Sequence, residues 1–169
     1  FVNRKLSVRL FNMTFALPFT RSGKKLTIAI VGLGSMGQRY ASILSSHPSS
    51  ILHGCDTRSD KVFNSQTHYH HVSLNKLLGQ ATPTVAVIAV PAVEHLQVLR
   101  AIKFANPTCA VLMEKPLTDH ALTEDEAHWC SGLEGLNAVG YNWRFHPFAK
   151  ELWKMREDIC DISFFVAQD

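Results

Sequence analysis

The glycine motif Gly32-Leu33-Gly34-Ser35-Met36-Gly37 has the spacing G-x-G-x-x-G. In such a turn the first glycine permits a tight bend, the second lets the backbone approach a ligand, and the third allows close helix–strand packing. The N–H groups of Ser35 and Met36 would then face an anion at a helix start. The motif follows an apolar strand-like run and opens a helical one, which is the context that binding of a pyrophosphate requires. We therefore interpret Gly32, Gly34, Ser35, Met36 and Gly37 as a dinucleotide-binding turn rather than a turn without a ligand.

An acidic residue lies where such a turn needs one. Asp56 ends the second strand-like run, 24 positions after Gly32, near the usual spacing of about 20. Its carboxylate can accept hydrogen bonds from both hydroxyls of a ribose, which favours NAD. Arg58 can pair with a 2′-phosphate or stack on adenine, which keeps NADP open as the second choice. The alternative is that Asp56 is a simple turn residue.

Two further strand ends would supply the opposite side of a ligand crevice. Val90 and Pro91 end one strand, and His95 lies in the helix that follows. The triplet Glu114-Lys115-Pro116 ends the next strand. A lysine ammonium at the carboxyl end of a parallel strand can hydrogen-bond a substrate hydroxyl or help to move its proton. A solvated turn is the alternative for this triplet.

Strand-like and helix-like segments alternate along the chain. This alternation predicts a doubly wound α/β fold with a parallel sheet and helices on both faces. The expected strands are 26–32, 50–56, 84–90, 108–113, 136–141 and 159–167, and the expected helices are 35–46, 59–66, 74–78, 93–105, 123–133 and 146–156.

The composition limits the function classes. With 169 residues, 46% of them hydrophobic and 18% charged, the chain has room for one full-sized domain. Its net charge of +3 is too small to predict a nucleic-acid partner, and its apolar runs are too short to predict a membrane span. The four cysteines lack C-x-x-C spacing, which favours free thiols in a reducing, cytoplasmic setting and disfavours structural zinc.

Residues 1–24 differ from the remainder because they are basic and contain no acid. We expect a disordered extension that results from the way the chain was cut; a mitochondrial targeting segment is the alternative. The cluster His68-x-His70-His71 is expected to be a surface loop, and no metal site is predicted.

The ordered set of motifs resembles the glucose–fructose oxidoreductase, inositol dehydrogenase and MocA (Gfo/Idh/MocA) family over residues 25–169. The set includes Pro91-x-x-x-His95, and its more diagnostic parts are Glu114-Lys115-Pro116 and the segment Tyr141-Asn142-Trp143-Arg144-Phe145-His146-Pro147. The resemblance implies that Lys115 is catalytic beside a nicotinamide, and that the Lys115–Pro116 bond is a candidate cis peptide. It also implies hydride transfer at a hydroxyl or keto carbon of a sugar, cyclitol or related compound, and a homo-oligomer in the full-length protein.

The same resemblance divides the chain. It implies a dinucleotide-binding Rossmann domain at 25–142 and the start of a truncated second α+β domain at 143–169, where Arg144 and His146 are candidates for substrate contact. The family has Thr where this chain has Val90, and the family's second-domain acid–base residues do not follow Tyr141 here. We therefore expect cofactor binding with little activity from this chain. A sensor or accessory module that binds a dinucleotide without catalysis is the alternative.

Overall fold

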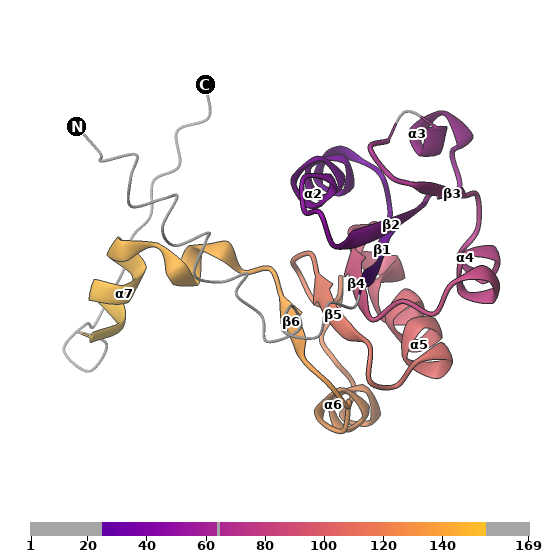
Figure 1. The fold of residues 1–169 in the computed structure, drawn as a ribbon. Coiled ribbons are helices and arrows are strands. Elements are labelled where there is room, and N and C mark those ends of the chain that lie inside the picture. The colour runs from indigo at the N-terminus through magenta and orange to yellow at the C-terminus, as the bar shows by residue number, and fades with distance from the viewer. Residues whose placement is uncertain (1–24, 64, 155–169) are drawn as a thin grey trace, which may run out of the picture.

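The computed structural model describes residues 25–63 and 65–154. Six parallel strands form one sheet in the order β3-β2-β1-β4-β5-β6 (Figure 1). Their bounds are β1 Leu26–Val31, β2 Ser50–Cys55, β3 Tyr69–His71, β4 Val85–Ile88, β5 Ala110–Met113 and β6 Asn137–Val139. The order reverses between β1 and β4, so the carboxyl ends of these two strands flank the point at which α/β sheets bind ligands.

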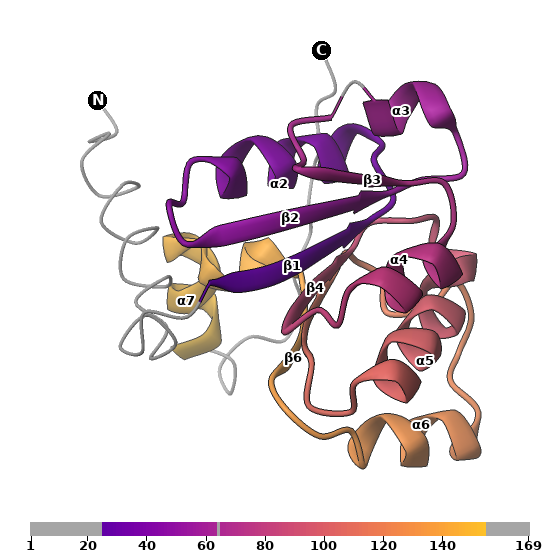
Figure 2. The same ribbon diagram turned by 45° about the vertical axis from the view of Figure 1, so that its right-hand side comes forward.

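Helices cover both faces of this sheet (Figure 2). One face carries α2 and α3, and the other carries α4, α5 and α6. The helices are α2 Ser35–Ser45, α3 Ser59–Phe63, α4 Leu74–Gln80, α5 His95–Ala105, α6 Glu124–Ser131 and α7 Pro147–Lys154, with 3-10 turns η2 Ala92–Glu94 and η3 Asn142–Phe145. The predicted doubly wound parallel sheet is confirmed.

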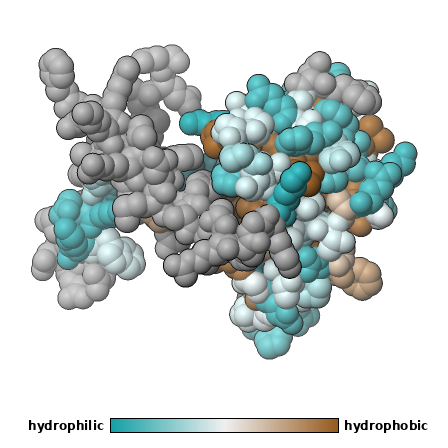
Figure 3. Space-filling model, viewed as in Figure 1, coloured by the Kyte–Doolittle hydropathy of each residue, from teal (hydrophilic) through white to brown (hydrophobic). Residues whose placement is uncertain are grey.

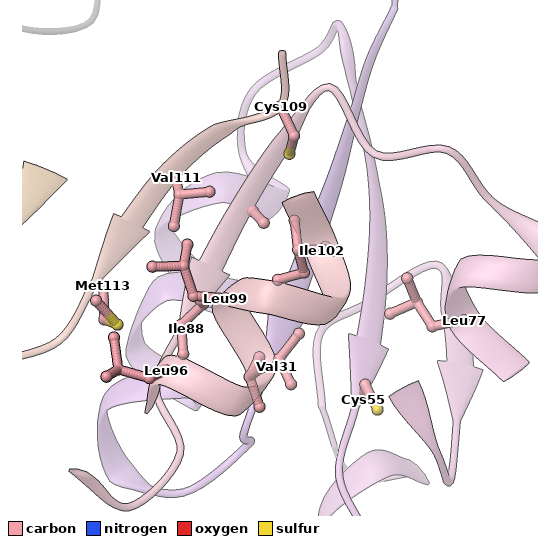
Figure 4. Packing of buried hydrophobic residues seen from close by; sticks show 13 residues of the cluster. Val31, Cys55, Leu77, Ile88, Leu96, Leu99, Ile102, Cys109, Val111 and Met113 are labelled. Carbon is pink, nitrogen blue, oxygen red and sulfur yellow. The ribbon is translucent and has the colours of Figure 1, made fainter. Parts of the chain in front are cut away.

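Alternate residues of β1 enter two separate hydrophobic clusters. Ile28 and Ile30 pack with Ala41 of α2, whereas Ala29 and Val31 pack toward the helices of the opposite face. Figure 4 shows the second cluster, in which Leu96, Leu99 and Ile102 of α5 lie over β4 and β5. A strand buried on both faces reads as a continuous apolar run, which explains the sequence of β1.

Other parts of the described chain are partly solvated. On the face drawn in Figure 3, hydrophobic side chains are scattered among hydrophilic ones.

Helix α6 begins with a capping box, in which the Thr123 hydroxyl accepts from the Glu126 N–H and the Glu126 carboxylate accepts from the Thr123 N–H. Among the helices of the described residues, none is long and apolar enough to cross a membrane.

A buried lysine closes the end of α5. Lys103 is 6% exposed, and its ammonium donates to the carbonyls of Cys109, Glu134 and Pro107 at 2.6, 2.7 and 3.2 Å. These three bonds join the loops before β5 and β6, and burial lowers the pKa of Lys103. Lys103 is therefore a structural cross-link between loops.

Several expected elements differ from the observed ones in type or in length. Two of the three clustered histidines, His70 and His71, lie in strand β3 rather than in a loop, because β2 offers them a parallel edge that hydropathy alone does not reveal. Helix α4 continues through Gly79, where nothing lies within 4 Å of an added Cβ. The expected helix 93–105 is a 3-10 turn followed by α5, and the expected strand 84–90 is shortened to Val85–Ile88. The expected strand 159–167 and the extension 1–24 lie outside the described residues.

Candidate dinucleotide site

The three glycines of the turn differ in what surrounds them. Gly32 has φ +87°, and an added Cβ would lie 2.5 Å from the Ala89 carbonyl oxygen, so the end of β4 requires glycine here. A Cβ on Gly37 would lie 1.8 Å from the Gly32 carbonyl oxygen. By contrast, nothing lies within 4 Å of a Cβ on Gly34. The fold therefore explains Gly32 and Gly37, whereas the space beside Gly34 is open to a ligand.

The backbone donors at the start of α2 have no side-chain cap. Gly34 is the N-cap residue and has no side chain to accept from them, and no acidic residue lies in the first turn. Helices α4 and α6 differ, because Ser73 and Thr123 cap them. Ser35 is exposed and Met36 is half-buried at the first two helical positions. Uncapped N–H groups with the positive end of a helix dipole fit an anionic diphosphate.

Asp56 holds the glycine turn against the end of β2. Its Oδ2 accepts from the Leu33 N–H at 2.7 Å, and its Oδ1 accepts from the Arg58 N–H at 2.9 Å. A carboxylate has about four acceptor sites, so two remain for ribose hydroxyls. Asp56 is half-buried at the carboxyl edge of the sheet, which fits the predicted ribose contact.

Arg58 lies beside this carboxylate and is itself paired. Its guanidinium donates to Asp60 through Nη2 at 2.9 Å and through Nε at 3.3 Å. The pair raises the pKa of Arg58 and lowers the pKa of Asp60, because hydrogen bonding and charge favour both ionised forms. The structure thus gives Arg58 a partner that the sequence interpretation did not include.

The opposite side of the site is held together by His95. This side chain is 1% exposed, with Nδ1 at 2.7 Å from the Pro116 carbonyl oxygen and Nε2 at 2.9 Å from the Val90 carbonyl oxygen. A neutral imidazole has a single N–H, which donates to one of these carbonyls. His95 therefore lies between the ends of β4 and β5, which is a positioning role, and its contact with a cofactor stays a prediction. Val90 is half-buried and Pro91 is exposed, as residues that border a crevice can be.

The triplet Glu114-Lys115-Pro116 follows β5 directly. The Lys115–Pro116 peptide bond is cis, as expected. Glu114 is 9% exposed, and the Tyr40 hydroxyl of α2 donates to its Oε1 at 2.6 Å. Burial and the neighbouring carboxylate raise the pKa of Tyr40, so the phenol remains a donor. Lys115 is exposed, and within residues 25–63 and 65–154 no hydrogen bond or ion pair engages its ammonium group.

The candidate substrate residues lie after β6. Arg144 belongs to η3, and its side chain falls outside the described residues. His146 is exposed between η3 and α7. In Figure 1 this segment lies to one side of the sheet, beyond β6. A contact with substrate stays a prediction for both residues.

Sequence reasoning missed three residues of this region: Leu33, Tyr40 and Asp60. Tyr40 lies one turn after Gly37 on α2. A tyrosine among otherwise apolar helix positions indicates a buried hydroxyl that needs a hydrogen-bond partner. Asp60 lies two residues from Arg58, a spacing short enough to suggest pairing. The Leu33 contact uses the backbone, which sequence cannot show.

A second polar cluster lies away from the glycine turn. His53 and His71 are buried on β2 and β3, with Nδ1 of His53 and Nε2 of His71 at 3.1 Å, and the Tyr69 ring stacks on His53. Burial lowers the pKa of both histidines. No group of three potential metal ligands occurs among the described residues. The stacked rings of this cluster pack together at the edge of the sheet.

A family model described as "Oxidoreductase family, NAD-binding Rossmann fold" (GFO_IDH_MocA) matches residues 26–129. A comparison with curated proteins finds no match. Three solved structures illustrate the likeness of fold. GenD2 from gentamicin A biosynthesis, in complex with NAD, is 26% identical with a TM-score of 0.63, covering 81% of this chain and 41% of that chain.

The other two structures are more distant in sequence. The WlbA dehydrogenase from Bordetella pertussis, in complex with NADH and UDP-GlcNAcA, is 21% identical with a TM-score of 0.65, covering 80% of this chain and 40% of that chain. Apo scyllo-inositol dehydrogenase from Lactobacillus casei is 20% identical with a TM-score of 0.64, covering 79% of this chain and 42% of that chain. The chain thus spans about 40% of the length of these structures.

The family description confirms the predicted nicotinamide cofactor class. The match extends from β1 into α6 and includes the glycine turn, Asp56 and Glu114-Lys115-Pro116. The chain therefore belongs to the Gfo/Idh/MocA oxidoreductase family, through its NAD-binding Rossmann domain.

Proposed function

We propose that residues 25–142 bind NAD(H) and form the cofactor domain of a dehydrogenase that acts on a polyol or sugar-like substrate. The observation that carries the proposal is the open space beside Gly34 at an uncapped helix start, between two glycines that the fold itself requires. An added Cβ at Gly34 would meet no protein atom within 4 Å, so the space that it would fill is free for a diphosphate. The residues present therefore fit a dinucleotide.

Each group of the site then has a defined task. The N–H groups of residues 34–36 hold the diphosphate, and the two remaining acceptor sites of Asp56 hold the ribose hydroxyls. His95 and Tyr40 keep the ends of β4 and β5 in place. The bound nicotinamide supplies the hydride acceptor or donor.

Lys115 is the residue of this chain that we propose to touch the substrate. Its exposed ammonium follows β5 at the ligand edge of the sheet, and it can donate to a substrate hydroxyl or hold the proton that leaves that hydroxyl. A polyol or sugar derivative is the substrate class supported by the solved relatives, which include inositol dehydrogenases and an enzyme bound to UDP-GlcNAcA.

The cofactor proposal is tested by titrating NADH into the chain and following NADH fluorescence. We expect one binding site with a Kd in the micromolar range, since KM values of enzymes are commonly ~1 µM–1 mM. Asp56→Asn should weaken binding at least tenfold, whereas Asp125→Asn, the same change on the exposed first turn of α6, should not. Equal binding by all three proteins would contradict the proposal.

The catalytic proposal is tested by absorbance at 340 nm with NAD and a panel of inositols and sugars. Turnover that disappears in Lys115→Met, with NADH binding retained, supports a dehydrogenase. Because we expect little turnover from this chain alone, titration of the same panel into the NAD-saturated chain decides the case in which no turnover is seen. Polyol binding that is lost in Lys115→Met supports a dehydrogenase, whereas no polyol binding supports the alternative, a dinucleotide-binding sensor.

A further inference from the structure

The arginine that follows Asp56 by two residues already has an acidic partner. Arg58 follows Asp56 by two residues, and the backbone N–H of Arg58 donates to Asp56. The guanidinium of Arg58, however, turns to Asp60 and forms two hydrogen bonds of 2.9 and 3.3 Å with it. Asp60 lies in the first turn of α3, so the helix that follows β2 supplies the competing acceptor.

The state of this cation matters because NAD and NADP differ in one group at this place. NADP carries a 2′-phosphate, which needs a cationic partner and is repelled by a carboxylate such as Asp56. A guanidinium has the planar donor fork that binds phosphate with two hydrogen bonds. In this chain the same two donors, Nε and Nη2, bind Asp60 instead.

The charges around Asp56 also favour NAD(H) over NADP(H). Asp56, Arg58 and Asp60 together carry one net negative charge within five residues, next to the glycine turn that Asp56 holds. A 2′-hydroxyl gains a hydrogen bond from such a site, whereas a phosphate dianion meets a net repulsion. Neutralising Asp60 would leave one carboxylate and one released guanidinium.

We propose that Asp60 is a specificity-determining residue: by pairing with Arg58 it keeps the adenosine ribose site selective for NAD(H) over NADP(H). This inference rests on the proposed function, since it concerns the same cofactor site. It assigns Asp60 an indirect role, through the position and charge of Arg58, without any contact between Asp60 and the cofactor.

The effect should be moderate in size. Both partners are exposed, at 65% and 59% of their side-chain surfaces, so solvent weakens the pair. Breaking an exposed ion pair changes an equilibrium by about two- to fivefold. Removing the repulsion on the phosphate adds to this, so Asp60→Asn should tighten NADPH binding by roughly three- to tenfold at low salt. NADH binding should stay within about twofold, because a hydroxyl needs no cation.

The test is a double-mutant cycle read by calorimetric titration of NADH and NADPH at low salt. It uses the unaltered chain, Asp60→Asn, Arg58→Gln and the double variant, with Asp125→Asn as the matched control. We expect the full NADPH gain in Asp60→Asn alone, no gain in the control, and in the double variant only the smaller part that comes from removing the repulsion by the Asp60 carboxylate. Thermal unfolding of each variant checks that the fold is retained.

Two results would overturn the inference while leaving the proposed function intact. One is NADH binding by the unaltered chain with no gain for NADPH in Asp60→Asn. The other is a gain that is undiminished in the double variant, because Arg58 would then have no part in it. Failure of the unaltered chain to bind either coenzyme would instead overturn the proposed function, and the inference with it.

Discussion

Alanine substitutions at Gly34 and Gly37 separate what the ligand requires from what the fold requires. Both glycines belong to the same turn, but a Cβ on Gly37 would lie 1.8 Å from the Gly32 carbonyl oxygen, whereas a Cβ on Gly34 would have nothing within 4 Å. Gly34 has φ −68° and ψ −163°, which alanine adopts without strain. The two variants should therefore fail in different assays.

The expected magnitudes follow from these contacts. Overpacking against backbone costs about 1–3 kcal/mol or more. For a chain of this size that lowers Tm by roughly 3–10 °C in Gly37→Ala. The free energy of unfolding of Gly34→Ala should lie within about 0.5 kcal/mol of that of the unaltered chain. Its NADH affinity should fall at least tenfold, because each hydrogen bond to a charged group contributes about 1.5–3 kcal/mol.

Thermal unfolding by circular dichroism and NADH titration, run on the same samples, provide the measurements. The reasoning would be refuted if Gly34→Ala bound NADH as tightly as the unaltered chain. It would also be refuted if Gly34→Ala lost as much stability as Gly37→Ala, because the open space beside Gly34 would then not exist.

Three other predictions concern groups outside the glycine turn. Tyr40→Phe removes the hydroxyl that donates to the buried Glu114 carboxylate, and should lower the free energy of unfolding in urea by about 1–3 kcal/mol; no change would mean that water replaces it. Lys103→Met removes one donor from each of three carbonyls, of which that of Glu134 keeps the amide of Asn137, and should lower the free energy of unfolding by about 2–4 kcal/mol in the same assay; a loss below about 1 kcal/mol would contradict a cross-linking role. Burial lowers the pKa of His53 and His71 in the folded chain below the unfolded value of 6.5, so the unfolded chain takes up protons first and stability should fall as pH drops below about 6.5. Replacing both histidines by glutamine should remove this part of the pH dependence, and an unchanged pH profile would refute the assignment.

The sequence predicted the architecture because its strongest signals are local. β1 and β4 are apolar runs that only a sheet covered on both faces can bury, and the glycine turn follows β1 with the spacing that dinucleotide binding demands. The edge strand β3 was missed because three residues with exposed side chains at two positions carry little hydrophobic pattern. Its strand conformation comes from pairing with β2, a tertiary effect.

The places of the candidate site residues in the fold could be predicted for the same reason. Asp56 and Lys115 follow strands, so their location at the carboxyl edge could be derived from the chain order. The contacts that position them could not. The bond from Tyr40 to Glu114 spans 74 residues, and His95 reaches two carbonyls whose proximity depends on the packed ends of β4 and β5.

The central claim is that the backbone amides at the start of α2 hold the diphosphate of a dinucleotide. Nuclear magnetic resonance of the ¹⁵N-labelled chain during NADH titration tests it most directly. The amide resonances of Gly34, Ser35 and Met36 should shift and saturate together at one equivalent of NADH. Unchanged resonances at these three positions, while amides elsewhere respond or none responds, would contradict the claim.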